Sequence, residues 1–94
     1  MKIEHKTILV VEDEKPIRDM IRFAIHREFN MIDAKDVAEA KFRIKNAIPD
    51  LILLDWMLPD KSGISFIKDL KNEAVTREIP NMALPPKLVL QLCC

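Results

Sequence analysis

The stretches ILVVEDE at residues 8–14 and DLILLDWMLP at residues 50–59 decide the fold. Each contains a continuous apolar run rich in branched side chains, which is typical of a strand covered on both faces in a parallel sheet. Each run also ends abruptly in acidic residues. We therefore predict strands at residues 7–11 and 51–54, and a weaker strand at 30–34.

Three amphipathic helices are predicted between and after these strands. In the first, Pro16 suits the first turn, where its missing N–H costs nothing. Its apolar positions recur at the spacing of one helix face: Ile17, Met20, Ile21, Ala24 and Ile25.

The second helix is predicted to begin after Asp36, whose side chain caps it together with Glu39 three residues on, and to stop before Pro49. Its predicted apolar face consists of Val37, Ala40, Ile44 and Ile48. The third helix is predicted at about residues 63–72, burying Ile64, Ile67 and Leu70.

Strands and helices thus alternate along the chain. This order predicts right-handed βαβ units, hence an α/β fold with a doubly wound, flavodoxin-like parallel sheet. A fourth strand should follow Pro80, but Pro85 and Pro86 would interrupt a strand or a helix there. We predict one partial domain at residues 1–80 and a divergent tail at 81–94, so that the fold is incomplete at its C-terminus.

Composition excludes several functions. With 94 residues, 15 basic and 15 acidic, the chain is one small domain of zero net charge, which argues against direct nucleic-acid binding and against a polybasic membrane anchor. The single glycine, Gly63, excludes a Walker A loop and a dinucleotide-binding fingerprint. Cys93 and Cys94 form no disulfide framework, and no membrane span or signal peptide is expected, so we expect a cytoplasmic protein.

Three carboxylates form the candidate chemical site. Glu12 and Asp13 follow the first strand and Asp55 follows the third, and ligands of doubly wound sheets bind at the carboxyl ends of strands. Clustered carboxylates repel unless a cation neutralises them, and oxygen ligands without His or Cys suit Mg²⁺. One carboxylate would then be a nucleophile towards phosphorus. Taken singly, each residue also fits a structural role as a helix cap or in a solvated loop.

Together these stretches resemble the receiver domain of bacterial response regulators, within the OmpR subfamily. The resemblance covers residues 6–80 and extends through Ser62-Gly63-Ile64, Phe66-Ile67-Lys68, Leu70-Lys71 and Thr76-Arg77-Glu78-Ile79-Pro80. It implies a phosphoacceptor module of a two-component system that belongs, in intact form, to a transcriptional regulator.

The resemblance also implies roles for individual residues. Asp55 would take a phosphoryl group from a sensor histidine kinase. Asp13 would bind Mg²⁺ directly, Glu12 through water, and Met57 through its backbone carbonyl. The loop at the exit of the third strand would be shaped by Pro59 and Gly63.

Two features of the family are missing after Pro80: the Thr or Ser that ends its fourth strand and the Lys that ends its fifth. An interaction-only fragment that no longer switches therefore remains an alternative. A haloacid-dehalogenase-like phosphatase is disfavoured, because its general acid would fall at Met57, which cannot transfer a proton. We expect no enzyme, and an unpaired strand edge predicts a homo-oligomer.

The basic residues of the first predicted helix are Lys15, Arg18 and Arg22. They lie on one side of this helix, and we interpret them as a solvated face. Docking of the kinase is the less favoured interpretation.

Overall fold

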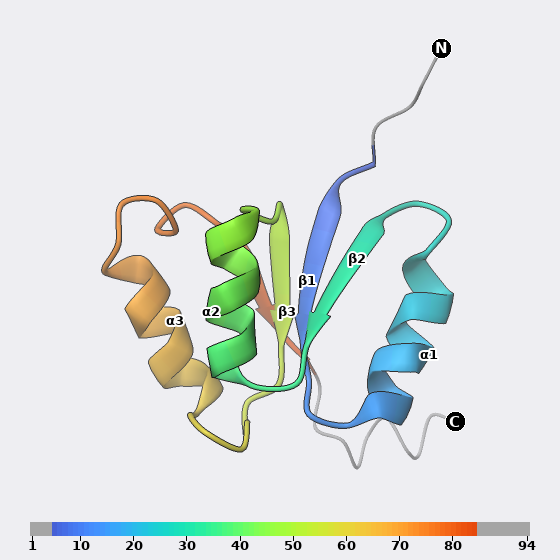
Figure 1. Ribbon diagram of the computed structural model, residues 1–94, viewed down its shortest axis with the longest axis horizontal. Coiled ribbons are helices and arrows are strands. Elements are labelled where there is room, and N and C mark those ends of the chain that lie inside the picture. Colours follow the sequence, from blue (N-terminus) through green and yellow to red (C-terminus); the bar gives the residue numbers. More distant parts are fainter. Residues whose placement is uncertain (1–4, 85–94) are drawn as a thin grey trace.

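A four-stranded parallel sheet forms the centre of the molecule in the computed structural model, which describes residues 5–84. The strands lie in the order β2-β1-β3-β4, and their carboxyl ends share the lower edge in Figure 1. Their bounds are Thr7–Val11 for β1, Asn30–Ala34 for β2, Leu51–Leu54 for β3 and Asn81–Ala83 for β4. The predicted α/β parallel architecture is thereby confirmed.

Helices connect the strands, with α1 at Lys15–Ile25, α2 at Val37–Asn46 and α3 at Gly63–Lys71. The strand expected after Pro80 is present as β4, and the backbone N–H of Leu84 continues the ladder by donating to Leu54 O at 2.7 Å. The remainder of the tail, residues 85–94, lies outside the described residues.

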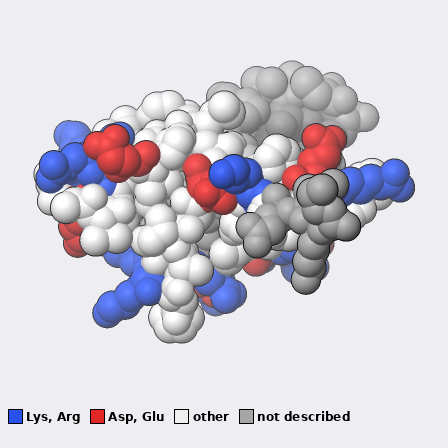
Figure 2. Space-filling view, turned by 90° about the horizontal axis from the view of Figure 1, so that it is seen from above, with Lys and Arg blue, Asp and Glu red and all other residues white. Residues whose placement is uncertain are grey.

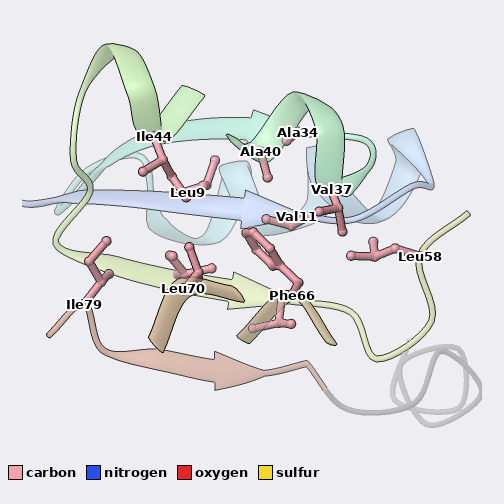
Figure 3. Packing of buried hydrophobic residues seen from close by; sticks show 12 residues of the cluster. Leu9, Val11, Ala34, Val37, Ala40, Ile44, Leu58, Phe66, Leu70 and Ile79 are labelled. Atoms are coloured by element: carbon pink, nitrogen blue, oxygen red, sulfur yellow. The ribbon is translucent and has the colours of Figure 1, made fainter. Parts of the chain in front are cut away.

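The main hydrophobic core lies between the sheet and the pair α2 and α3. Figure 3 shows Leu9 of β1 close to Ile44 of α2, and Val11 of β1 close to Phe66 of α3. Phe66 is fully buried, so this side chain is the central packing element of α3. The core cluster comprises Leu9, Val11, Ala34, Val37, Ala40, Ile44, Ile52, Leu54, Leu58, Phe66, Leu70 and Ile79.

One residue predicted on the apolar face of α2 and one predicted to be buried in α3 are exposed. Ile64 in the first turn of α3 is 50% exposed, because the buried face of this helix is set by Phe66 and Leu70. Ile48 is 49% exposed, because α2 ends at Asn46 with Ala47 as its C-cap and no longer holds Ile48 on the helix face. The predicted capping at the other end is confirmed: Glu39 N donates to Asp36 Oδ1 at 2.8 Å, and Lys35 N donates to Glu39 Oε1 at 2.8 Å.

The opposite face of the sheet is only partly covered. Side chains alternate between the faces of a strand, so Ile8 and Val10 point away from the core cluster, as does Asp33, which is paired in register with Val10. Arg18 and Arg22 of α1 form ion pairs with Asp33, which places α1 on this second face.

The apolar face predicted for α1 is only partly covered: its three isoleucines are half-buried, Met20 and Ala24 are exposed, and α1 contains no fully buried residue. Leu51 and Leu53 of β3 are only half-buried, and Met82, paired in register with Leu53, is 59% exposed. We call Leu51, Leu53 and Met82 the open face. It exists because α1 lies beside β2 and does not extend over β3 and β4 in the described part of the chain.

Charges of both signs are mixed on the face that holds the amino-terminal ends of the strands (Figure 2). This face therefore presents no extended basic surface for a polyanion. Among residues 5–84, no helix has the length and apolarity that crossing a membrane requires.

Candidate functional site

The site lies where β1 and β3 end side by side. Val11 and Leu54 are partners in the parallel register, so the residues that follow them are neighbours at the edge of the sheet. Backbone hydrogen bonds fix both positions, because Glu12 N donates to Ala34 O at 2.9 Å and Asp55 N donates to Val11 O at 3.0 Å. The two acidic residues are therefore placed by the sheet itself.

The three carboxylates singled out in the sequence do converge. Glu12, Asp13 and Asp55 each offer an oxygen, and these oxygens all lie within 4.8 Å of one another. Glu12 is 1% exposed and Asp55 is 7% exposed, so both sit in surroundings that disfavour uncompensated charge. Their convergence is a property of the fold, whereas the role of each in binding or chemistry stays a prediction.

A tight loop from Asp55 to Gly63 borders these carboxylates. Met57 N donates to Asp55 Oδ1 at 3.4 Å, Met57 and Ser62 form an antiparallel bridge, and Gly63 N donates to Trp56 O at 2.8 Å. The Met57 side chain is 80% exposed. The predicted contribution of its backbone carbonyl to a metal is untested.

The tip of this loop is fixed to two helices. Asp60 accepts hydrogen bonds from the backbone N–H groups of Val37 and Ala38, both at 3.0 Å. Burial raises the pKa of Asp60, but these N–H groups outweigh that effect and the pKa lies below its usual value. Next to it, Lys61 pairs with Asp69 of α3, and Lys61 together with Lys41 holds the pKa of Asp69 below its usual range.

The interpretation of the basic residues of α1 as a solvated face is wrong for Arg18. Its guanidinium donates to Glu12 O at 2.8 Å and pairs with Asp33 at 3.2 Å, and its side chain is only 15% exposed. Arg18 thus ties α1 to the residue that opens the site. Lys15 fits the prediction, because its ammonium group pairs with Asp19 of the same helix and its side chain is 75% exposed.

Sequence reasoning misinterpreted Arg18 and did not single out Asp33 or Asp60, for one physical reason. Arg18 and Asp33 are 15 residues apart, and Asp60 is 23 residues from Val37. Only the fold brings these partners together. The sequence does contain one signal for Asp60, because an acidic residue in a loop is suited to capping a helix N-terminus. Nothing in the sequence says which helix it would meet.

Comparison with known sequences gives a consistent result. A profile of the response regulator receiver domain matches residues 8–84. The chain is 51% identical over 80 residues to the phosphate regulon transcriptional regulatory protein PhoB of Escherichia coli, and 45% identical over 83 residues to PhoB of Pseudomonas aeruginosa. The matches cover 84% and 87% of this chain, but only 35% and 36% of the relatives, so the chain spans about a third of their length.

Solved structures show the same fold. The N-terminal receiver domain of a response regulator from Methanoculleus marisnigri has a TM-score of 0.81 at 28% identity, covering 96% of this chain and 78% of that one. The phosphorylated cyanobacterial phytochrome response regulator RcpA has a TM-score of 0.76 at 29% identity, covering 85% and 64%. The Mn²⁺-bound form of the response regulator Rcp1 has a TM-score of 0.75 at 26% identity, covering 83% and 63%.

These matches agree with the geometry. The acidic cluster of Glu12, Asp13 and Asp55 is typical of the metal site of receivers, and a receiver is a signalling module of two-component systems rather than an enzyme. Sheet order, acidic strand ends and sequence similarity over most of the chain thus lead to one assignment: the protein belongs to the family of response regulator receiver domains and is related to PhoB.

Proposed function

We propose that this chain accepts a phosphoryl group on Asp55 from a sensor histidine kinase, with Mg²⁺ held by Glu12, Asp13, Asp55 and the backbone carbonyl of Met57. The observation that carries the proposal is the convergence of three carboxylate oxygens, from two adjacent strand ends, within 4.8 Å. A carboxylate oxygen of Asp55 would attack phosphorus as the bond from phosphorus to the kinase histidine breaks. The product is an acyl phosphate on Asp55 and a free histidine on the kinase.

The donor set fits a hard divalent cation. Carboxylate and carbonyl oxygens without His or Cys suit Mg²⁺ or Mn²⁺, and Rcp1 is described as Mn²⁺-bound. Bonds of roughly 2.1 Å put opposite ligands of an octahedral Mg²⁺ about 4.2 Å apart. The three carboxylate oxygens all lie within 4.8 Å of one another, so one cation could be held by them directly or through water, and we propose the water-mediated contact for Glu12. A bound cation would offset the charge of the incoming phosphoryl group.

The wider role follows from the relatives. PhoB is a transcriptional regulatory protein, and we propose that this chain is the receiver part of such a regulator. We also propose that its partner is a sensor histidine kinase and that it is located in the cytoplasm. Direct contact with nucleic acid is not expected of this chain, because its 15 basic and 15 acidic residues balance.

Phosphoryl transfer is the direct test. The chain is incubated with acetyl phosphate and Mg²⁺, and the acyl phosphate is detected by intact mass. A version carrying a complete receiver C-terminus is treated in parallel. Transfer to both supports a phosphoacceptor, whereas transfer to neither under conditions that label a known receiver contradicts the proposal.

Mg²⁺ should bind weakly, and Asp13→Ala should weaken binding further by about ten- to a hundredfold, since it removes a direct ligand from an already crowded anionic site. Trp56 is the only tryptophan, follows Asp55 and is 46% exposed, so its fluorescence reports on the site. Asp19→Ala, on the exposed side of α1, is the control and should titrate like the wild type. An unchanged Mg²⁺ affinity in Asp13→Ala counts against this metal site.

Association between copies is the second expected property, and the open face supports it. Leu51 and Leu53 are half-buried, Met82 is 59% exposed, and β4 is the edge of the sheet among the described residues. Exposed apolar surface next to an unpaired strand edge favours pairing with another copy. Zero net charge leaves no long-range repulsion to prevent it.

We therefore expect light scattering to show a dimer or larger assembly to which residues 81–94 contribute. Met82→Lys should shift the assembly towards monomer, because it places a charge on the edge strand. Phe42→Lys, at an exposed position of α2 on the other side of the sheet, is the matched control and should leave the assembly unchanged. A stable monomer at high concentration would contradict this part of the proposal.

A module that binds but no longer switches is the second candidate, and one observation favours it. In the described residues, β4 ends in Ala83 and is followed by Leu84, and neither side chain has a hydroxyl. The Thr or Ser that the family resemblance implies at the end of this strand is thus not found within residues 5–84. Phosphorylation without a change of association state would support this candidate.

A further inference from the structure

Three backbone N–H groups in the first turn of α2 are satisfied by carboxylates, two of them by a residue from another part of the chain. The first four N–H groups of a helix have no partner within the helix. The regular helical bonds begin with Ala40 N, which donates to Asp36 O at 3.0 Å. Of the three N–H groups before it, that of Glu39 donates to Asp36 Oδ1 at 2.8 Å. The remaining two, those of Val37 and Ala38, donate to Oδ1 and Oδ2 of Asp60, each at 3.0 Å.

Asp60 belongs to the loop that leaves the phosphoacceptor strand. Its two carboxylate oxygens engage two adjacent amides, so the pair of hydrogen bonds defines both position and orientation. The positive end of the helix dipole adds to the attraction for this carboxylate. A loop tip held in this way transmits its position to Met57, because Met57 and Ser62 are bridged across the base of the loop.

We propose that Asp60 is a positioning residue that fastens the loop from Asp55 to Gly63 to the start of α2 and thereby orients the Met57 carbonyl. The inference rests on the proposed function for its consequence, metal binding, but the anchoring itself is a separate physical claim. Asp60 is not among the residues proposed to hold the cation or to accept the phosphoryl group.

Two other anchors of the same loop are less directional. Leu58 is 8% exposed and belongs to the core cluster. Apolar contacts have no preferred direction, so they keep the loop against the core but do not fix its orientation. The ion pair of Lys61 with Asp69 depends on a long and flexible lysine side chain, and surface pairs of this kind contribute little. The bidentate contact of Asp60 is therefore the element that sets the orientation of the loop.

The matched comparison is Asp60→Ala against Asp36→Ala. Both variants remove a carboxylate that caps α2, so both weaken the same helix terminus. Only Asp60→Ala also releases the loop, because Asp36 directly precedes the helix that it caps. Asp60→Asn, which keeps one acceptor oxygen, is the milder variant and should give an intermediate effect. Circular dichroism confirms that each variant is folded.

The first readout is independent of any metal. Gly63 is the only glycine, so labelling with ¹⁵N-glycine gives a single amide signal, and this amide donates to Trp56 O across the loop. Asp60→Ala should speed hydrogen exchange of this amide by about tenfold over Asp36→Ala, as expected when two hydrogen bonds that resist local opening are lost. Equal exchange rates in the two variants overturn the proposal.

The second readout is the Mg²⁺ titration followed by Trp56 fluorescence. Asp60→Ala should raise the dissociation constant by about tenfold, the effect typical of residues that orient metal ligands, whereas Asp36→Ala should leave it unchanged. If the exchange rates differ but the wild type does not respond to Mg²⁺, the anchoring stands and the metal role fails. If Mg²⁺ binds equally well to both variants, the orienting role of Asp60 is overturned.

Discussion

Replacing Asp55 with Asn should abolish phosphorylation of the chain by acetyl phosphate, while the protein stays folded. Asn has nearly the same shape but lacks the anionic oxygen that attacks phosphorus. The buried position at the end of β3, beside Glu12 and Asp13, makes Asp55 the carboxylate that faces the candidate cation site. Intact mass after incubation with Mg²⁺ and acetyl phosphate measures the loss directly.

Asp50→Asn is the matched control, because Asp50 stands just before β3 as Asp55 stands just after it. The Asp50 carboxylate accepts a hydrogen bond from Thr7 N at 2.8 Å, and Asn keeps an acceptor oxygen for that bond. This variant should be labelled like the wild type. Labelling that survives in Asp55→Asn would show that the phosphoacceptor has been assigned to the wrong residue.

The phosphorylated form should switch little. A phosphoryl group adds about −1.5 to −2 charges near neutral pH, and cations and hydrogen-bond donors must compensate this charge. The described end of β4, Ala83 and Leu84, offers no side-chain donor. A ligand shifts an equilibrium only by its differential affinity for the two states, so few new contacts mean a small shift. A large change in association state on phosphorylation would contradict this expectation.

The strands could be predicted to the residue because their signal is local. Thr7–Val11, Asn30–Ala34 and Leu51–Leu54 match the predicted ranges, and the first and third of these are continuous branched apolar runs of the kind that favours buried strands. The convergence of Glu12, Asp13 and Asp55 follows from the same signal. Once two parallel strands are neighbours, the residues after them must meet at one edge.

Helix faces were harder to predict, because burial depends on which surface is available to pack against. The apolar stripe of α1, from Ile17 to Ile25, has the correct period, but the described sheet offers it too little surface and none of it is fully buried. In α3 the prediction chose Ile64 over Phe66, although Phe66 is fully buried. Apolar periodicity shows that a face exists, whereas the neighbouring sheet decides its rotation.

Gly63→Ala should destabilise the chain by about 2 kcal/mol, within the range for overpacking a tight contact. A Cβ at this position would lie 2.6 Å from the backbone oxygen of Asp55, 2.8 Å from Leu54 Cδ1 and 3.2 Å from Trp56 Cα. The Leu54 side chain can adopt another rotamer. The Asp55 carbonyl is part of the backbone, so it can move only if the backbone of the carboxylate site moves too. Ordinary replacement of Gly by Ala in a helix is stabilising, so the expected sign is opposite to that of helix propensity.

Urea unfolding followed by circular dichroism gives the free energy, and Ser65→Ala in the same first turn of α3 is the control. Ser65 uses its backbone N–H, not its side chain, to reach Ser62 Oγ at 3.1 Å, so its substitution should cost little. Because the strain in Gly63→Ala falls on the Asp55 carbonyl and on Trp56, fluorescence of the folded variant should change as well. A variant as stable as the wild type would mean that α3 can shift away from β3 without cost, and close packing of this helix would then not fix the loop that carries Asp55.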